Sequence, residues 1–263
     1  MSAPVLHATD LHVIRNGVDI LALEQLDISA GEHWAILGPN GAGKSTLLNV
    51  LGTREFPSRG HVDILGETLG RTDVFALRRR IGYVDPKQRL GDIDCTEAVM
   101  SGITASNGLI PRWEPSKRDL QVTGQSIELV GMQTRAHHRW MRMSQGEKAR
   151  TLIARALVTE PELLLLDEPS TGLDLPGRER ILTTLDLLRQ SQKRLASVTI
   201  THHVEEIAAS TTHALLIKDG GVLAAGEISE TLNSRNLSEL YDMNVDLHTY
   251  RGRWMSFAAD GPR

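Results

Sequence analysis

The stretch GPNGAGKST, residues 38–46, contains the pattern G-x-x-x-x-G-K-[ST] in full. It follows the short apolar run His33–Leu37 and precedes leucines at helical spacing, so it is predicted to join a strand to a helix beginning at Lys44. Glycines let consecutive backbone N–H groups face one ligand, and the helix N-terminus adds a positive dipole, which suits phosphate. The alternative is a glycine-rich turn that only caps a helix. The candidate phosphate-binding residues are Gly38, Pro39, Asn40, Gly41, Ala42, Gly43, Lys44, Ser45 and Thr46.

A second candidate segment is LLLLDE, residues 163–168. Four consecutive leucines predict a strand buried on both faces, and they place Asp167 and Glu168 at its carboxyl end, where open α/β sheets bind ligands. Together with the phosphate loop, the segment suggests that Lys44 meets the terminal phosphates and that Ser45 and Asp167 hold Mg²⁺. Glu168 would then polarise the attacking water. The plainer interpretation is a strand whose terminal acids are simply solvated.

Composition places the chain among soluble globular proteins. It has 263 residues, 40% hydrophobic and 24% charged, with a net charge of −4 and one cysteine, Cys95. The longest stretch without Asp, Glu, Lys or Arg, Ala98–Pro111, is too short and too polar for a membrane span. The N-terminal sequence MSAPVLHATD lacks a basic region followed by an apolar one, so no signal peptide is expected. The mild acidic charge gives no general attraction to nucleic acid.

Apolar periodicity predicts a strand–helix alternation interrupted by a helical region. The expected strands are Val5–Ile14, Ile20–Ile28, His33–Leu37, His61–Leu65, Ile81–Val84, Leu163–Asp167, Ala196–Thr201 and His213–Ile217. The expected helices are Val74–Arg80, Cys95–Ile103, Ser116–Val130, Thr134–Arg139, Gly146–Val158, Gly177–Gln190 and Val204–Ala209. Strands separated by helices imply a mostly parallel sheet covered on both faces. We therefore expect an α/β core from residues 1–89 and 144–263, with antiparallel N-terminal strands and an inserted helical subdomain at 90–143.

Three further motifs accompany the phosphate loop and the LLLLDE segment. MSQGE (143–147) lies between them, and STGLD (170–174) and TITHH (199–203) follow. In this order and spacing, the chain resembles the ATPase subunits of ABC transporters over nearly its whole length. The resemblance implies a single ABC-type domain over 1–263 with the P-loop NTPase (RecA-like) fold. It also implies ATP and Mg²⁺ as ligands and ATP hydrolysis as the activity. A GTPase is disfavoured because no Asn-Lys-x-Asp motif occurs.

The MSQGE segment has a local explanation as well as a family one. Ser144 with Glu147 three residues later forms a capping box, which is an ordinary way to begin a helix. The resemblance implies more, because in the family Ser144 and Gly146 would contact the γ-phosphate bound by the opposite subunit of a dimer. The usual pattern has two glycines and a glutamine where this chain has Gln145-Gly146-Glu147. That departure bears on the affinity for ATP and on the rate of ATP turnover, and not on the role of the segment.

Two adjacent histidines follow the strand Ala196–Thr201. His202 matches the histidine that in the family touches the γ-phosphate across from the catalytic glutamate, because it directly follows the last threonine of the strand. His203 is the alternative. A metal site is disfavoured here because adjacent histidines point in different directions and no spaced Cys or His partners accompany them.

Two matches to the family are looser. The family has a glutamine almost directly after IGYV, residues 81–84, where it contacts Mg²⁺ and the attacking water; here Gln88 is the candidate, in a displaced register. The family also stacks an aromatic ring on adenine after the first strand. The corresponding position falls near Arg15, whose guanidinium could stack instead, or which is simply a surface arginine.

The resemblance implies a dimer, either of two copies or of related subunits, on integral membrane permease subunits, with a substrate-binding protein as a further component of importers. The helical subdomain 90–143 would face the permease, and Trp113 is either an anchor for it or a core residue. The location implied is the cytoplasmic face of the cell membrane. The stretch after residue 213 resembles importers of iron chelates, cobalamin and molybdate, which favours uptake of a metal chelate or an oxyanion. The alternative is a soluble ABC ATPase acting on ribosomes or DNA.

Overall fold

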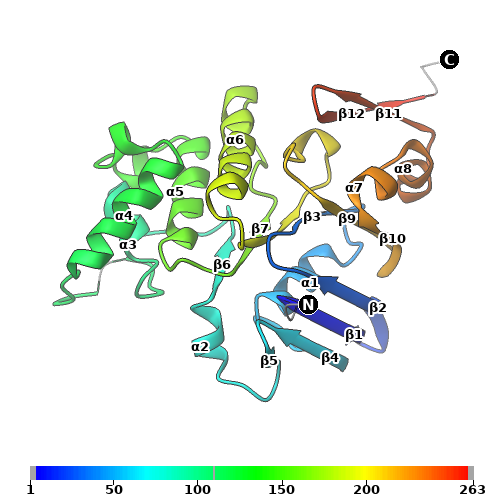
Figure 1. Ribbon diagram of the computed structural model, residues 1–263, viewed down its shortest axis with the longest axis horizontal. Helices are drawn as coiled ribbons and strands as arrows, with labels where there is room; N and C mark the ends of the chain where they lie inside the picture. The colour runs from blue at the N-terminus through cyan, green and yellow to red at the C-terminus, as the bar shows by residue number, and fades with distance from the viewer. Residues whose placement is uncertain (1–3, 109, 260–263) are drawn as a thin grey trace.

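The computed structural model describes residues 4–108 and 110–259, so the ends of the chain, including the start of the N-terminal stretch considered above, lie outside the described residues. Ten strands form one sheet in the order β5-β4-β1-β2-β10-β9-β3-β8-β7-β6 (Figure 1). The strands of this sheet are β1 (Leu6–Arg15), β2 (Val18–Ile28), β3 (His33–Leu37), β4 (Arg59–Ile64), β5 (Glu67–Thr68), β6 (Ile81–Val84), β7 (Leu163–Asp167), β8 (Ala196–Ile200), β9 (His213–Lys218) and β10 (Gly221–Glu227). The fold is the expected α/β architecture.

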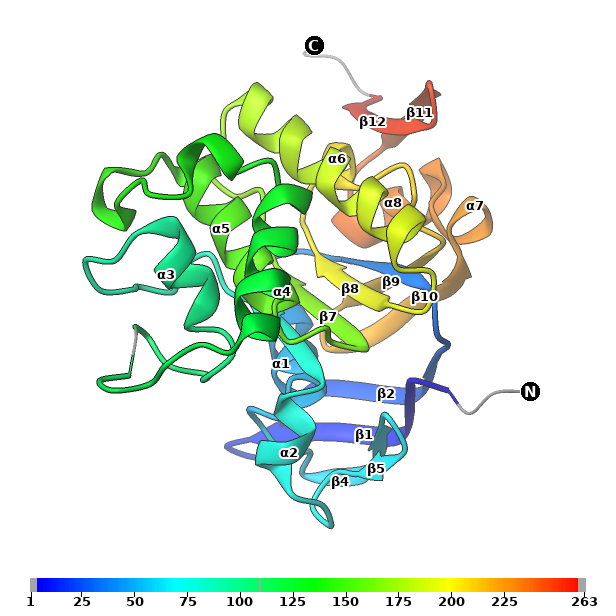
Figure 2. The same cartoon turned by 60° about the vertical axis from the view of Figure 1, so that its left-hand side comes forward.

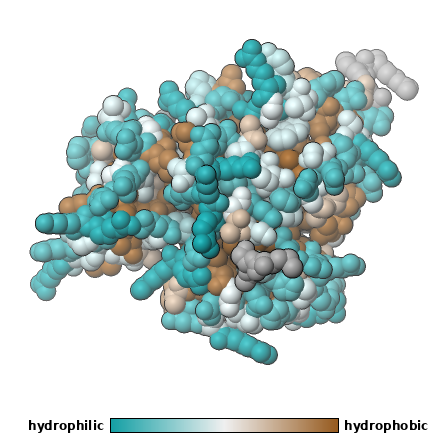
Figure 3. All heavy atoms as spheres, viewed as in Figure 1, coloured by the Kyte–Doolittle hydropathy of each residue, from teal (hydrophilic) through white to brown (hydrophobic). Residues whose placement is uncertain are grey.

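The helices alternate with these strands as predicted in most places. They are α1 (Lys44–Leu51), α2 (Val74–Arg78), α3 (Cys95–Met100), α4 (Lys117–Leu129), α5 (Gln145–Leu157), α6 (Leu175–Ser191), α7 (Ile228–Thr231) and α8 (Ser234–Tyr241). Within the described ranges, no helix is long and apolar enough to cross a membrane. On the face shown in Figure 3, hydrophobic residues lie in separate patches between hydrophilic ones.

The parallel centre of the sheet is buried on both faces. Strands β6, β7, β8, β3 and β9 pair in parallel, and every residue of β3 is buried. In β7, Leu163 and Leu165 belong to a core with α1 and the N-terminal strands, whereas Leu164 and Leu166 belong to a second core with α3, α4, α5 and α6. Because side chains alternate along a strand, a run of leucines satisfies both cores at once.

The N-terminal strands are antiparallel, as expected. β1 and β2 form a hairpin in which Leu6 lies opposite Ile28, and β4 pairs with the other edge of β1. The connecting residues Asn16 and Gly17 both have positive φ (52° and 77°), which is the conformation that two-residue hairpin turns require and that Asn-Gly tolerates.

The helical region packs through one hydrophobic cluster with the sheet. Residues of α3, α4, α5 and α6 share this cluster with Val84 of β6 and with β7, and Figure 2 shows these helices gathered beside the sheet. The division at residues 90 and 143 stays a prediction, because α5, on the core side of that boundary, packs with α3 and α4. Trp113 is half-buried in the loop before α4.

Two expected helices are single turns. Instead of a helix over Thr134–Arg139, the chain has the 3₁₀ turn η1 (Gln133–Arg135), followed by a second, η2 (Trp140–Arg142). Instead of one over Val204–Ala209, it has η3 (Val204–Glu206). This turn has no side-chain cap at His203, and Ile207 is already extended.

The C-terminal part contains elements that periodicity did not predict. α7 and α8 cover Ala35, Leu37 and Leu216 of the sheet in a third hydrophobic cluster. A separate two-stranded hairpin, β11 (Val245–Tyr250) and β12 (Arg253–Ala258), follows them. In Figures 1 and 2 this hairpin lies beyond α8, at the end of the colour scale.

Candidate functional site

The phosphate loop is held by close backbone contacts with neighbouring strands. A Cβ on Gly43, whose φ is +102°, would lie 2.7 Å from the carbonyl oxygen of Ile20 in β2. A Cβ on Gly38 would collide with the carbonyl of Ile217 in β9. The carbonyl of Ala42 accepts a hydrogen bond from the N–H of Gly220 at 3.2 Å. These approaches leave no room for side chains at the two glycines, so the loop is set against the sheet.

The loop presents donors without partners. In the described chain, the backbone N–H groups of residues 43–46 donate to no other group, and α1 has no side-chain cap and no acidic residue in its first turn. Lys44 is buried, and its Nζ donates to the carbonyls of Gly38 at 2.7 Å and Pro39 at 2.9 Å. Free N–H groups at a helix N-terminus beside a buried ammonium make a site for an anion. The arrangement fits the terminal phosphates of a nucleotide.

The second candidate segment reaches the same edge of the sheet. Asp167 ends β7 and Glu168 follows it with a φ of +48°, a left-handed conformation that costs a non-glycine residue about 1 kcal/mol or more. The N–H of Glu168 donates to the carbonyl of Ile200 in β8 at 3.1 Å. This bond continues the pairing of β7 with β8, and the left-handed conformation of Glu168 ends the strand at the carboxyl edge.

The phosphate loop and the second segment follow β3 and β7, which both pair in parallel with β8, and their charges act on each other. Burial is the main cause that raises the pKa of Asp167, and the charges of Glu168 and Asp85 add to it. Burial also lowers the pKa of Lys44, while Glu168 and Asp167 act in the opposite direction. The pKa values of Lys44 and Asp167 thus each respond to the charge of the other, as expected of a lysine and an acid at one sheet edge.

Glu168 has two polar neighbours that position its carboxylate. Nδ1 of His202 lies 3.3 Å from Oε1 of Glu168, and the hydroxyl of Thr171 donates to Oε2 at 3.1 Å. His203 is exposed, and its ring centre lies 4.2 Å from that of His202. Of the two histidines, it is His202 that contacts the glutamate. Sequence reasoning did not single out Thr171; its place in STGLD, three residues after Glu168, is the signal that could have found it.

The donors around the loop suit a magnesium ion that keeps other ligands. Among the residues described, no group of three or more His, Cys, Asp or Glu side chains is placed to hold a metal ion by itself. Mg²⁺ is commonly bound by one or two protein oxygens together with substrate phosphates and waters. The exposed Ser45 hydroxyl and the Asp167 carboxylate are oxygen donors of that kind.

The MSQGE segment forms the predicted capping box at the start of α5. The N–H of Glu147 donates to Oγ of Ser144 at 3.2 Å, and the N–H of Ser144 donates to Oε2 of Glu147 at 2.9 Å. Ser144 is exposed, and a Cβ on Gly146 would lie 3.5 Å from Cα of Gly177 in α6. The helix end therefore faces solvent beside the start of α6, where a second molecule can reach it.

The two looser candidates are engaged elsewhere. The amide of Gln88 donates to Oδ1 of Asn107, at 3.2 Å, in the helical region. Two charged residues of the loop after β6 act on the pKa of Asp167: Asp85 raises it and Lys87 lowers it. The guanidinium of Arg15 donates to both carboxylate oxygens of Glu55, at 2.7 and 2.8 Å. Their roles at a nucleotide stay predictions.

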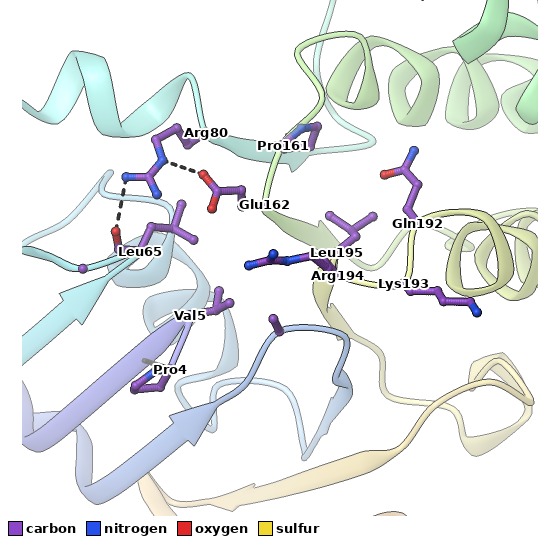
Figure 4. A pocket seen from close by; sticks show the side chains of 12 residues that line it. Pro4, Val5, Leu65, Arg80, Pro161, Glu162, Gln192, Lys193, Arg194 and Leu195 are labelled. Atoms are coloured by element: carbon purple, nitrogen blue, oxygen red, sulfur yellow. Dashed lines mark hydrogen bonds and ion pairs between the residues drawn. The ribbon is translucent and has the colours of Figure 1, made fainter. Parts of the chain in front are cut away.

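A pocket of about 450 Å³ lies at the opposite edge of the sheet (Figure 4). Arg80, Glu162 and Leu195, which line it, precede β6, β7 and β8, whereas the phosphate loop follows β3. Because these strands are parallel, the pocket lies at their amino ends and away from the candidate site. Nε of Arg80 donates to Glu162 at 2.7 Å, so these two charges satisfy each other.

Comparisons with known proteins agree with this geometry. Residues 23–171 match the family described as ABC transporter. The uncharacterized ABC transporter ATP-binding protein YlmA of Bacillus subtilis is 40% identical over 245 residues, which are 92% of each chain. A structure described as an inward-facing conformation of a putative metal-chelate type ABC transporter aligns with a TM-score of 0.79 and 26% identity, over 96% of both chains. A dimeric ATP-binding cassette in a post-hydrolysis state, bound to ADP and Pi, aligns with a TM-score of 0.72 and 26% identity, over 85% of this chain and 98% of the other.

Proposed function

This chain belongs to the ABC transporter family as an ATP-binding subunit with ATPase activity, and we propose that it drives solute uptake through separate membrane subunits. The observation that supports this most directly is that Lys44 and the acids Asp167 and Glu168 follow β3 and β7, two strands that both pair in parallel with β8 and so end at the same edge of the sheet. That edge brings a phosphate site and a candidate general base together. The similarity to ATP-binding subunits of ABC transporters supports transport as the process that this hydrolysis drives.

We propose the following roles for the residues of the site. Residues 38–46 bind the phosphates of ATP, and Lys44 neutralises the terminal ones. Ser45 and Asp167 would hold Mg²⁺, with Gln88 as a further candidate; when bound, the ion neutralises charge on the phosphates. Glu168 accepts hydrogen bonds from His202 and Thr171 and would orient and polarise the attacking water.

The exposed start of α5 supports a two-subunit arrangement. Ser144 and Gly146 lie at a helix end that faces solvent, and they would contact the γ-phosphate held by the phosphate loop of the partner. ATP would then stabilise a closed dimer, and hydrolysis would release it, which is a ligand-driven shift between two states. The family dimerises, as the related post-hydrolysis structure illustrates. The partner would be a second copy of this chain or a related ATPase subunit.

We further propose that the cargo is a metal chelate or an oxyanion. The related structure of a putative metal-chelate type transporter covers 96% of this chain and supports this choice. The resemblance of the C-terminal stretch to importers of chelates and molybdate supports the same choice. The ATPase would lie on the inner face of the membrane, where residues 90–143 would contact the permease and the half-buried Trp113 would be an anchor for it.

The test is to capture the partners in the closed state. Tagged Glu168→Gln protein, loaded with Mg-ATP, would be used to isolate complexes from detergent-solubilised membranes of the source cell, followed by mass spectrometry. We expect a polytopic membrane protein in near-equal amounts with this chain. Lys44→Ala, which removes the phosphate contact but leaves the fold's apolar cores intact, is the matched control and should recover less of it.

The alternative has a distinct outcome in the same experiment. Recovery of ribosomal or DNA-bound proteins alone would replace the transport proposal with a soluble ABC ATPase. ATP hydrolysis, measured separately as Mg²⁺-dependent phosphate release, would be unaffected by that result.

A further inference from the structure

The C-terminal hairpin is attached to two segments that lead away from the candidate site. Arg253, at the start of β12, donates from Nη1 to Oε2 of Glu179 at 2.9 Å and from Nη2 to Oε1 of Glu179 at 3.4 Å. The same Nη2 donates to the carbonyl oxygen of Glu205 at 2.8 Å. One guanidinium therefore joins α6 to the single turn η3.

Further contacts from the C-terminal region reach the same stretch of chain. The N–H and the hydroxyl of Ser256 both donate to Oε1 of Glu205, at 2.9 and 3.1 Å. The hydroxyl of Tyr241, at the end of α8, lies 3.3 Å from the carbonyl oxygen of His202 and donates to it. Tyr241 thus bonds the backbone of His202, and Arg253 and Ser256 bond the backbone and the side chain of Glu205.

The two segments that Arg253 joins carry the groups around Glu168. η3 begins two residues after His202, whose ring contacts Glu168. Glu179 lies in α6, the helix capped by Asp174, whose side chain accepts from the N–H of Gly177 at 2.9 Å. The loop from Glu168 to Asp174 therefore leads into one of the segments, and the loop through His202 leads into the other.

We propose that the C-terminal hairpin is a clamp that positions His202 against Glu168, and that Arg253 is the positioning residue that closes it. This inference rests on the proposed role of His202. η3 is a single turn without a side-chain cap, so its own hydrogen bonds hold it weakly. A forked arginine contact to one carboxylate and one carbonyl fixes direction as well as distance. Arg253 is mostly shielded from solvent, with 26% of its side chain exposed, which limits competition from water.

A local contact holds the other side of the same segment. The hydroxyl of Thr201 donates to Oε2 of the buried Glu206 at 2.6 Å. The hydroxyl of Thr201 also accepts from the N–H of His203 at 3.1 Å, so the chain is held before His202, and the clamp holds it after His202, at Glu205. Because a misplacement of about 1 Å in a catalytic contact can lower a rate by up to about a hundredfold, loss of the clamp should be visible in turnover.

The test compares Arg253→Gln with Arg251→Gln in ATP hydrolysis by the full-length protein. Arg251 is in the turn of the same hairpin, where its guanidinium lies over the ring of Tyr250. Arg253→Gln should lower kcat by about 5- to 20-fold while the KM for ATP changes less than about twofold. Arg251→Gln should leave both parameters unchanged. Hydrogen exchange should become faster in residues 202–206 of Arg253→Gln and stay unchanged in residues 38–46.

The decisive readout is the combination with His202→Ala. If Arg253 acts through His202, Arg253→Gln will add less than about a twofold loss in the His202→Ala background. An effect that multiplies in full in that background would show a general structural role and overturn the clamp. Turnover of Arg253→Gln at the wild-type rate would overturn it as well.

Two arms separate this proposal from those on which it rests. If His202→Ala is slow and Arg253→Gln is normal, only the clamp is wrong. If His202→Ala turns over normally, the role of His202 is wrong and the clamp falls with it. Should Arg253→Gln fail to fold, Ser256→Ala removes one hydroxyl of the clamp and should shift kcat in the same direction by about twofold; an unchanged kcat would then count against the proposal.

Discussion

Nδ1 of His202 lies 3.3 Å from Oε1 of Glu168, although the two residues are 34 positions apart in the chain. They come together because β7 and β8 pair in parallel, with Asp167 opposite Ile200, so that both strands end at the same edge. A carboxylate and an imidazole at hydrogen-bonding distance can share the orientation of one water molecule. Glu168 also has a left-handed backbone, with a φ of +48°, and such conformations are concentrated at functional sites.

The first prediction concerns Glu168 itself. Glu168→Gln should bind ATP with nearly unchanged affinity and hydrolyse it at least about a hundredfold more slowly, because the amide cannot accept a proton from water. Phosphate release and nucleotide binding would be measured on the same sample. Glu162→Gln, at the opposite edge of the sheet, is the control and should hydrolyse normally. Normal turnover in Glu168→Gln would remove this residue from the mechanism.

The second prediction separates the adjacent histidines. His202→Ala should lower kcat by about 10- to 100-fold, because it removes a neighbour of the catalytic carboxylate. His203→Ala should stay within about threefold of wild type, since its ring is exposed and lies against that of His202, whereas it is His202 that contacts Glu168. The reverse order of effects would assign the role to His203.

The third prediction concerns Thr171, whose hydroxyl donates to Oε2 of Glu168. Thr171→Val keeps the shape of the side chain and removes the donor, so kcat should fall by about 3- to 10-fold with little change in thermal stability. Thr159→Val is the matched control, because Thr159 follows α5 near the opposite edge of the sheet and its hydroxyl donates to the carbonyl of Ala156 at 3.5 Å. Equal rates for both variants would show that Glu168 needs no help from this hydroxyl.

The fourth prediction concerns Lys44. Lys44→Ala should weaken ATP binding by at least about tenfold, because a buried ammonium that faces the phosphates is lost. The change should appear in nucleotide titrations by fluorescence. An unchanged affinity would mean that the free N–H groups of residues 43–46 alone account for binding.

The fifth prediction concerns stability and pH. His33 is buried, and desolvation lowers its pKa from 6.5 to about 4, with the charge of Arg189 acting in the same direction. The unfolded chain therefore binds a proton between pH 6.5 and 4 that the folded chain does not, so the free energy of unfolding falls as the pH falls through this window. The resulting loss of unfolding free energy reaches about 3 kcal/mol at most by pH 4 and is absent above pH 6.5.

His33→Asn isolates this contribution from that of the other titrating groups. Denaturant unfolding of the variant and the wild type at pH 7.5 and 5 should show a smaller loss for the variant at the lower pH. Asparagine could keep a hydrogen bond to Ser197, whose hydroxyl lies 2.7 Å from Nδ1 of His33. Parallel pH profiles for the two proteins would rule out His33 as the source.

Local sequence determined the two halves of the candidate site. The glycines and Lys44 of residues 38–46 and the acids after four leucines are recognisable because their chemistry is contained in a few adjacent residues. Burial on both faces of β7 follows from the same short pattern, so the parallel core was predictable. β10, α7, α8 and the C-terminal hairpin were not, since their strands and helices depend on distant partners more than on their own periodicity.

Only the tertiary structure decided which distant residues work together. It brings His202 rather than His203 to Glu168, adds Thr171, and engages Gln88 and Arg15 with Asn107 and Glu55. It also attaches Arg253 to both Glu179 and Glu205. The physical reason is that a side chain's neighbours at one sheet edge are set by strand order and by loop geometry, and neither is encoded within the few residues around it.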